Sequence, residues 1–484
     1  MNAVQETPVA GGKPPNPNAV VAVLAFAGIT VALMQTLIIP LLPSLPGLLG
    51  ASPSNTSWAV TATLLAASVA TPVMGRLGDM YGKRKMLLVS LGLLTVGSVV
   101  VAMSESLTPM IVGRALQGLA AGVIPLGISI MRDELPKDRL PGAMALMSAS
   151  LGVGGALGLP AAAFMADKVD WHLLFWAAAG IGVVCVALVS FLVPESKVRS
   201  GGRFDLVGAL GLSAGLVALL LGVSKGADWG WTDPLAIGMF AAAVVILLAW
   251  GRFELKTREP LVDLRTTARR QVLLTDLAGV VFGFATLAIS LLLPQLLQLP
   301  EATGYGMGQS MVVVGLVMAP SGVAMMIAAP FSARITKAKG PKTTLMIGSV
   351  VVAAAYALGM FFMAEIWQLV LVAALIGVGI GLAYGAMPTL IMDATPPSET
   401  ASANSLNTLM RSIGTSFASA VSGVILANMT TDFHGVAVPS EGSFQLIFGI
   451  AAAAAVGAMV VAAFLPRRMR APEPEPLVPV GAAA

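Results

Sequence analysis

The sequence predicts an all-α membrane protein that crosses the bilayer about fourteen times, with two six-helix bundles and two extra helices between them. Its composition, the spacing of its apolar runs and an internal repeat support this fold class. Of the 484 residues, 57% are hydrophobic and 11% are charged, whereas a soluble globular chain carries about 25% charged residues. With a mean hydropathy of +0.88, the composition excludes a water-soluble globular protein.

Apolar runs bounded by Pro, Gly and charged residues mark the candidate spans. A span needs about 20 apolar residues to cross a hydrocarbon core of about 30 Å. The first run is too long for the core of a signal peptide, so we interpret it as a span. The expected spans are about 19–43, 56–77, 84–103, 109–131, 141–166, 173–193, 205–224, 234–251, 272–299, 310–333, 343–362, 367–392, 403–429 and 443–465.

The distribution of Lys and Arg predicts the orientation. If the amino terminus is cytoplasmic, 24 of the 28 Lys and Arg residues fall on the cytoplasmic side. The outer loops then hold Lys168 and Lys225, and Arg114 and Arg411 lie inside spans. Cytoplasmic loops carry the excess of positive charge in membrane proteins, so both ends of the chain are expected in the cytoplasm.

A weak internal repeat relates the two halves of the chain at an offset of about 260 residues. It pairs Asp133, Pro136, Ala143, Leu146 and Gly154 with Asp393, Pro396, Ala403, Leu406 and Gly414. An offset of 258 pairs Pro72, Arg76 and Gly82 with Pro330, Arg334 and Gly340. Such repeats are typical of transporters, in which two similar bundles move about a central site.

The repeat divides the chain into five parts. Spans 1–6 and 9–14 are the duplicated bundles, and spans 7 and 8 form an insertion between them. The predicted parts are a cytoplasmic tail over 1–18, an amino-terminal six-helix bundle over 19–193, a linker with two extra spans over 194–271, a carboxyl-terminal six-helix bundle over 272–465 and a cytoplasmic tail over 466–484.

Several functional classes have no support in the sequence. Cys185 is the single cysteine, and the two histidines, His172 and His434, are far apart. This excludes an internal disulfide and argues against a metal cluster. No phosphate-binding loop of the G-x-x-x-x-G-K-[ST] type is present. We therefore expect no enzyme activity, no bound metal or other cofactor, and no nucleic-acid partner.

The stretch GRLGDMYGKRKML, which begins at Gly75, closely resembles the loop after span 2 in the major facilitator superfamily. Gly75 and Gly82 permit a tight turn, and Asp79 can face a helix amino terminus or a neighbouring cation. The resemblance implies a gating loop comprising these residues and Arg84, in which Asp79 locks the two bundles together. The repeat has Lys337 in place of Asp79, so the lock is expected on one side only.

A second motif, GRALQGLAAG at the start of span 4, resembles the R-x-x-Q-G motif of the same superfamily. The resemblance implies that Arg114 takes part in proton transfer. An arginine inside a span costs roughly 2.5–3.5 kcal/mol unless it is paired or hydrated. The alternative is an arginine that extends to the outer interface.

Further stretches resemble the drug:proton antiporter branch with fourteen spans, namely WHLLFW, RFDLVG, LLLPQLLQ and NSLNTLMRSIGTS. The antiporter motif on span 5 departs from G-P-x-x-G-G, although Gly154, Gly158 and Pro160 remain. Its small residues favour close helix packing. The branch usually carries an acidic residue in span 1, where this sequence has Gln35. A proton carrier is therefore absent at that position.

Candidate proton-coupling residues are ionisable groups inside or near spans, because such groups are costly in a membrane. They are Arg114, Asp276, Arg411 and Asp393. Asp276 lies about one turn into span 9, although it can equally reach the cytoplasmic interface. We hypothesise that Arg411 pairs with Asp276 or Asp393 and that this pair breaks on protonation. The alternative for Arg411 is a static brace of the carboxyl-terminal bundle.

The substrate cavity is expected near the bilayer midplane between the bundles. Met and aromatic surfaces suit varied lipophilic ligands, although the same residues commonly serve helix packing. Gln35 and Gln295 occupy matching places in the repeat, and a buried amide needs a partner. The candidates are Met34, Gln35, Phe282, Phe284, Gln295, Gln298, Tyr384, Met311 and Met318.

These features favour a proton-coupled exporter of lipophilic or cationic drugs or antibiotics that works by alternating access. Its partners are the small-molecule substrate, protons and the lipid bilayer. We expect a monomer in a bacterial plasma membrane. Two alternatives remain open at this point, namely a proton-coupled uptake symporter for a small metabolite and a membrane sensor without transport.

Overall fold

The computed structural model describes residues 16–42, 44–168 and 170–466, so most of the two predicted tails lies outside the described residues. Within these ranges, fourteen helical segments are long and apolar enough to cross a membrane, which confirms the predicted number. The helices of the first half are α1 (Pro17–Thr36), α2 (Leu45–Leu49), α3 (Pro53–Thr56), α4 (Trp58–Tyr81), α5 (Lys83–Ala102), α6 (Leu107–Gly118), α7 (Val123–Glu134), α8 (Leu140–Lys168) and α9 (His172–Leu192).

The remaining helices include the two linker spans and the second bundle. They are α10 (Leu206–Trp229), α11 (Pro234–Glu254), α12 (Leu264–Thr267), α13 (Arg270–Gln298), α14 (Met311–Lys339), α15 (Pro341–Gly359), α16 (Ile366–Ala394), α17 (Thr400–Asn428) and α18 (Glu441–Ala463). Short 3₁₀ turns are η1 (Ile39–Leu41), η2 (Leu119–Gly122), η3 (Glu301–Thr303) and η4 (Pro397–Glu399).

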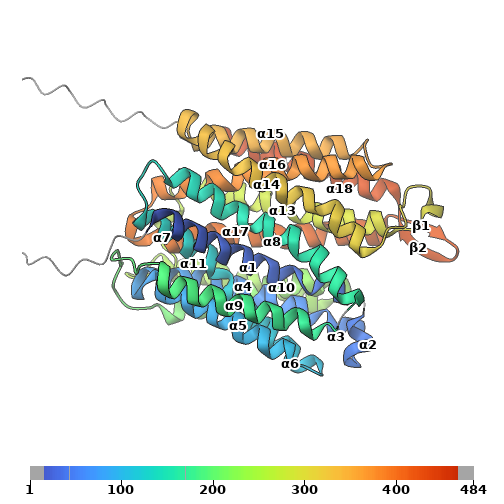
Figure 1. Cartoon of the computed structure of the whole chain (residues 1–484), viewed down its shortest axis with the longest axis horizontal. Helices are drawn as coiled ribbons and strands as arrows, with labels where there is room; N and C mark the ends of the chain where they lie inside the picture. The colour runs from blue at the N-terminus through green and yellow to red at the C-terminus, as the bar shows by residue number, and fades with distance from the viewer. Residues whose placement is uncertain (1–15, 43, 169, 467–484) are drawn as a thin grey trace, which may run out of the picture.

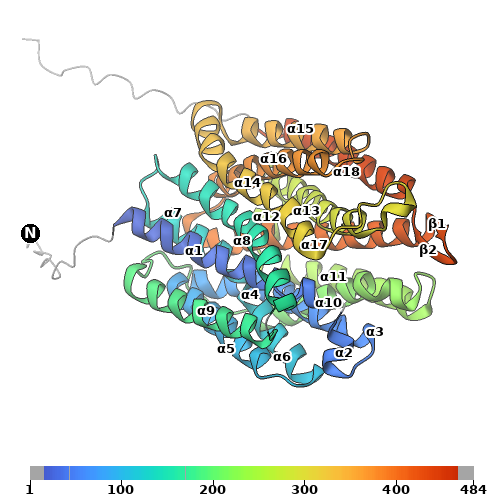
Figure 2. The same ribbon diagram turned by 45° about the vertical axis from the view of Figure 1, so that its right-hand side comes forward.

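The long helices run side by side along one axis of the molecule (Figure 1). Helices α1 and α4–α9 form one bundle, and α13–α18 form the other, which Figures 1 and 2 show as two layers. The start of α1 and the end of α18 lie at the same end of the molecule, which we call the inner end. The opposite, outer end carries α2, α3 and a hairpin.

That hairpin joins α17 to α18. Strands β1 (Thr430–Phe433) and β2 (Val436–Pro439) pair antiparallel. The two residues between the strands, His434 and Gly435, have φ values of 54° and 83°, as a type I′ turn requires.

Each bundle has its own apolar core. The amino-terminal core gathers residues such as Leu24, Leu91 and Phe175, and the carboxyl-terminal core includes Phe282 and Phe448. The second core also includes residues of α8, because α8 packs along α14 at the interface between the bundles. Helix–helix contact inside a bilayer depends on close packing rather than on the exclusion of water.

The linker helices lie beside the interface between the bundles. Helix α10 contacts both α4 and α17, and α11 packs against α10. The prediction that Lys225 lies in an outer loop is wrong. Lys225 is a buried residue of α10, and its ammonium group donates to Ser57 Oγ at 2.5 Å. The apolar run of span 7 ends at residue 224, whereas helix α10 continues to Trp229.

The two bundles share a single-residue turn at matching places in the repeat. Gly82 separates α4 from α5 with a φ of 122°, and Gly340 separates α14 from α15 with a φ of 86°. Both values lie in the region that only glycine adopts readily. The repeat therefore extends from the sequence to the backbone.

Candidate functional site

The carboxylate of Asp79 joins the inner ends of the two bundles. It is fully buried and accepts hydrogen bonds from the peptide N–H groups of Ala401, at 3.2 Å, and Ser402, at 2.8 Å. The Ser402 hydroxyl donates to it at 2.7 Å. First-turn N–H groups have no partner within their own helix and carry partial positive charge. Asp79 on α4 therefore caps α17 of the opposite bundle.

A chain of buried charge continues from this contact. Lys83 Nζ lies 3.9 Å from Asp79 Oδ1 and 2.5 Å from Asp133 Oδ2. The Ser196 hydroxyl donates to the same Asp133 oxygen at 2.5 Å. Lys83 is fully buried, so it is part of the junction rather than a surface charge of an inner loop.

The predicted gating loop is mostly helical. Gly75 lies inside α4, where a Cβ atom would come within 2.1 Å of Ser405 Oγ and 2.8 Å of the Ala401 carbonyl oxygen. The prediction that Gly75 permits a turn is therefore wrong, because its role is to let α4 approach α17 closely. Gly82 alone makes the turn. The Arg84 guanidinium donates to the Ser190 carbonyl.

Arg132 forms a second contact between the bundles at the inner end, and sequence reasoning missed it. From α7 its guanidinium donates to the carbonyls of Met392, at 2.9 Å, and Thr395, at 3.0 Å, and to Thr400 Oγ1 at 2.5 Å. The carbonyls at a helix carboxyl terminus carry partial negative charge. Arg132 thus caps α16, while Asp79 caps α17. The internal repeat includes its neighbour Asp133, and this was the feature of the sequence that could have directed attention to Arg132.

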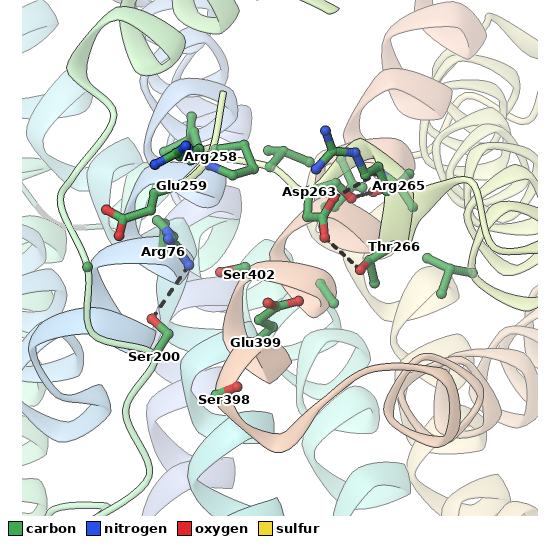
Figure 3. A pocket seen from close by; sticks show the side chains of 18 of the residues that line it. Arg76, Ser200, Arg258, Glu259, Asp263, Arg265, Thr266, Ser398, Glu399 and Ser402 are labelled. Carbon is green, nitrogen blue, oxygen red and sulfur yellow. Dashed lines mark hydrogen bonds between the residues drawn. The ribbon is translucent and has the colours of Figure 1, made fainter. Parts of the chain in front are cut away.

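A pocket of about 270 Å³ lies beside this junction, between the linker and the start of α17. Figure 3 shows Arg76 on one side, directed at Ser200, with the linker residues Asp263 and Thr266 opposite. Arg76 Nη1 donates to Ser200 Oγ at 3.5 Å, whereas its buried Nε has no partner. Ser402 also lines the pocket, so the linker, the Asp79 contact and α17 meet here.

Arg114 is buried in α6 and does not extend to the outer interface, since its exposed fraction is 1%. Its guanidinium donates to the carbonyls of Ala59 and Met34, each at 3.1 Å, and to Gln117 Oε1 at 2.7 Å. Gln117 in turn donates to Ser98 Oγ at 2.9 Å. Arg114 therefore joins α1, α4 and α6 through their polar groups.

A cavity of about 200 Å³ lies between the bundles. Its lining comes from α1 and α8 on one side and from α13, α14 and α16 on the other. It belongs to the outer half of the molecule, because Thr36 and Pro294 lie near the outer ends of α1 and α13. Among the described residues that line it none is charged, and the hydroxyl side chains are those of Thr36, Thr286, Ser290 and Ser321.

Of the predicted substrate residues, Met318 lines this cavity. Met34 is buried on the side of α1 that faces Arg114, and Phe284 packs in the carboxyl-terminal core. Gln35 and Gln295 were expected as buried amides, but both are exposed. Adjacent residues of the same two helices, Thr36 and Pro294, line the cavity instead.

Gln298 also differs from the expected cavity residue. Its side chain is exposed and donates to the carbonyl of Pro294 within α13 at 2.8 Å. The amide is therefore satisfied by its own helix.

Arg411 and Tyr384 form a cation–π pair inside the carboxyl-terminal bundle. The Arg411 guanidinium carbon lies 4.4 Å from the centre of the Tyr384 ring, and Nη2 donates to Thr408 Oγ1 at 3.2 Å. The Tyr384 hydroxyl lies 3.1 Å from Thr286 Oγ1. Thr286 lines the cavity, so the Thr286 hydroxyl connects the Arg411–Tyr384 pair to the cavity.

Asp276 is a buried carboxylate rather than an interfacial one, with an exposed fraction of 3%. Its Oδ1 accepts from Asn407 Nδ2 at 2.9 Å, and its Oδ2 has no partner. Asp393, at the inner end of α16, is exposed. In the part of the chain that the structure describes, Arg411 donates to Thr408 rather than to either carboxylate, so the hypothesised ion pair is not formed in this conformation.

The glycines of the span 5 motif bring α8 against α1. A Cβ at Gly154 would lie 2.5 Å from Ala32 Cβ, and one at Gly158 would lie 2.0 Å from Thr36 Oγ1. Pro160 lies inside α8 and contacts Gly315 of the opposite bundle. Small residues thus allow close approach at both faces of this helix.

Comparison with known proteins identifies the family to which this chain belongs. Residues 24–419, and separately 275–482, match the family model described as Major Facilitator Superfamily. The chain is 23% identical to "Multidrug resistance protein 3" of Bacillus subtilis over 78% of this chain and 73% of the relative. It is 24% identical to "Putative multidrug resistance protein MdtD" of Pectobacterium carotovorum, over 88% of this chain and 90% of the relative.

Among solved structures, the crystal structure of the human organic anion transporter MFSD10 (TETRAN) shares the fold. Its TM-score is 0.62 at 17% identity, covering 93% of this chain and all of that one. The family model spans most of the chain. This multi-pass membrane protein therefore belongs to the Major Facilitator Superfamily of transporters.

Proposed function

We propose that the protein is a proton-driven antiporter that exports lipophilic drugs or antibiotics from a bacterial cytoplasm. The observation that carries this proposal is the cavity between the bundles, which has an apolar lining with a few hydroxyl groups and no charged side chain among its described residues. A sugar or carboxylate substrate requires several convergent polar or charged groups. The apolar lining favours export of lipophilic compounds over uptake of a polar metabolite.

The orientation rests on charge. The inner end, where the described chain begins and ends, holds 20 of the 28 Lys and Arg residues, and four more belong to the tails outside the described residues. Because positive loops remain in the cytoplasm, we assign the inner end to the cytoplasm. The cavity then lies in the half of the molecule nearer the outside, and the Asp79 and Arg132 contacts hold the cytoplasmic end together.

Proton coupling is assigned to Asp276 and Arg114. Asp276 is a carboxylate held away from water in α13 with one oxygen lacking a partner. Such a group can bind a proton in one conformation and release it in another when its hydration changes. Arg114 fixes α1 to α4 and α6, so it orients the amino-terminal wall of the cavity. The two relatives named as multidrug resistance proteins support a drug-type substrate.

Dye efflux from energised cells, or dye accumulation in inside-out vesicles, tests this function. We expect a lipophilic cationic dye to be exported by the wild type, and a protonophore to abolish that export. Arg114→Ala should lower efflux while leaving membrane insertion and detergent-solubilised size intact. Efflux that is indifferent to the protonophore would refute proton coupling.

The role of Asp276 has its own test. Asp276→Asn keeps the size of the side chain and its bond to Asn407 but removes the titratable proton. We expect the pH dependence of efflux to flatten in Asp276→Asn and to remain in Glu301→Gln, a control at an exposed carboxylate of the outer end. An unaltered pH profile in Asp276→Asn would remove Asp276 from the proton route.

A further inference from the structure

The two linker helices hold a pair of acidic side chains at their inner ends. Glu254, the last residue of α11, has an exposed fraction of 2%, and its carboxylate faces the peptide N–H groups of Leu261 and Val262 and the indole of Trp250 without a well-aligned hydrogen bond to any of them. Asp205 caps α10, accepting from the Gly208 peptide N–H through Oδ1 at 2.7 Å. Its other oxygen, Oδ2, is buried without a partner. The transport site described above does not use this pair.

One oxygen of each carboxylate faces the same point. A Cβ placed on Gly208 would lie 2.4 Å from Asp205 Oδ2 and 2.7 Å from Glu254 Oε1, so these oxygens are no more than about 5 Å apart. The indole Nε1 of Trp250 on α11 is also buried and faces Glu254 without a well-aligned hydrogen bond. Because Gly208 has no side chain, the two carboxyl groups can approach each other over it.

No cation neutralises this pair among the described residues. The charged groups on the surrounding segments have other partners or are exposed. Arg265 donates to the Leu255 carbonyl at 2.7 Å, and Arg76 on α4 donates to Ser200. Arg252, Lys256, Arg258 and Arg203 are exposed. The nearby residues of α17 are the apolar Leu406 and Leu409.

Two ionised carboxylates at this separation repel each other, and a buried charge without a cation or a well-aligned donor beside it is costly. A single proton removes both problems, since the acid O–H of one group donates to the carboxylate of the other. We propose that Asp205 and Glu254 bind one proton between them, as a protonation site in the linker that is separate from both bundles. The binding step adds one proton to one carboxylate oxygen and needs no other reactant.

The site is placed to influence the inner junction. Residues Leu261 and Val262, in the loop after α11, pack with Leu406 and Leu409 of α17. The same loop forms a wall of the pocket in Figure 3. Loss of the proton would put two negative charges beneath this loop and loosen its contact with α17. The pH at the inner side would then change how the linker packs against α17, the helix that Asp79 caps.

Infrared spectroscopy of the protein in lipid nanodiscs tests the shared proton directly, independently of transport. The wild type should show a carboxylic-acid C=O band that is missing from Glu254→Gln, so a difference spectrum isolates the pair from other buried carboxyl groups. Glu259→Gln, at an exposed carboxylate five residues along, should leave the band unchanged. Identical spectra for the wild type and Glu254→Gln across the pH range would overturn the proposal.

Asp205→Asn provides a second variant that keeps the cap of α10. With its neighbour neutral, Glu254 no longer gains from sharing a proton, so its acid band should disappear at lower pH than in the wild type. Asp233→Asn is the matched control, because Asp233 caps α11 in the same way through Leu235 at the outer end. A band that titrates identically in the wild type and Asp205→Asn would show that the two groups do not share a proton.

Hydrogen exchange measures the consequence for the loop. After correction for the intrinsic pH dependence of exchange, residues 258–263 should exchange several-fold faster above the pH at which the band is lost. Glu254→Gln should hold the slow exchange at all pH values, since glutamine resembles the protonated acid. A loop whose exchange follows only the intrinsic rate would overturn the coupling to α17.

Discussion

The turn between α4 and α5 and the turn between α14 and α15 occupy matching places in the repeat but have different contacts. Both are made by one glycine with positive φ, Gly82 and Gly340. The first turn follows Asp79, which is buried against α17. The second follows Lys337, which is exposed and lines an inner pocket. Duplication has kept the backbone, whereas the charged contact between the bundles exists in one copy.

The second bundle is held by a residue outside the duplicated turn. Arg132 of the amino-terminal bundle caps the carboxyl terminus of α16, so the same bundle supplies both the anion and the cation. Each charge matches the sign of the helix end that it meets. The inner junction is therefore asymmetric: one bundle provides the charged side chains and the other provides the helix ends.

The largest effect is expected from Asp79→Asn. The asparagine keeps one acceptor oxygen but turns an NH2 donor toward one of the N–H groups of Ala401 and Ser402, leaving that group without an acceptor, and it removes the negative charge at the start of α17. Hydrogen bonds to charged groups contribute about 1.5–3 kcal/mol each, so the inner contact should weaken by about tenfold or more. Dye efflux should fall accordingly. Unchanged efflux in Asp79→Asn would remove the gating role from this residue.

Arg132→Ala should have the next largest effect. It removes a partly buried guanidinium with several acceptors, leaving the α16 carbonyls without this donor, which costs about 1–3 kcal/mol. We expect a several-fold fall in efflux and a lower melting temperature. Arg139→Ala is the control, because Arg139 lies in the inner loop that follows α7, is exposed and bonds within its own bundle to Asn18. Equal effects of the two substitutions would contradict a specific cap on α16.

Gly75→Ala tests the close approach of α4 and α17. The added methyl group would meet the backbone carbonyl of Ala401 and Ser405 Oγ, so the helices must separate, at a cost of about 1–3 kcal/mol. Labelling of a cysteine introduced by Glu399→Cys, which lines the inner pocket beside this contact, should increase. Gly92→Ala, at a helical glycine with open space around it, should be neutral or slightly stabilising. Labelling that rises equally in both would indicate a nonspecific effect.

Lys337→Ala should have the smallest effect of the four. An exposed charge contributes little, about 0–1 kcal/mol. Efflux within about twofold of the wild type is expected, with the same protonophore sensitivity. A loss as large as that of Asp79→Asn would mean that the two turns act symmetrically, contrary to the structure.

Much of the fold could be predicted because apolar length and turn glycines are local properties of the chain. The fourteen spans, the turn at Gly82 and a charged partner for Asp79 are of this kind. Which side chains face the cavity and which are exposed could not be predicted in the same way. Gln35 and Gln295 turned out to be exposed, and Thr36 and Pro294 line the cavity. Lipid is as apolar as a helix interface, so the pattern of apolar residues does not distinguish the two faces of a span.

Arg132 shows a second limit. Its sequence context indicates an inner-loop arginine, because positive charges gather on that side regardless of their contacts. Its acceptors, Met392 and Thr395, are about 260 residues away. Such a contact depends on how the two bundles meet, which the sequence pattern alone does not specify.

The central claim is that Asp79 holds the inner ends of the bundles together, and a distance measurement between those ends tests it most directly. Spin labels can be placed through Lys85→Cys on α5 and Lys339→Cys on α14, both exposed, because the native Cys185 is buried. In nanodiscs we predict one short inner distance for the wild-type background and a larger population of long distances with Asp79→Asn. Identical distance distributions in the two backgrounds would contradict the account.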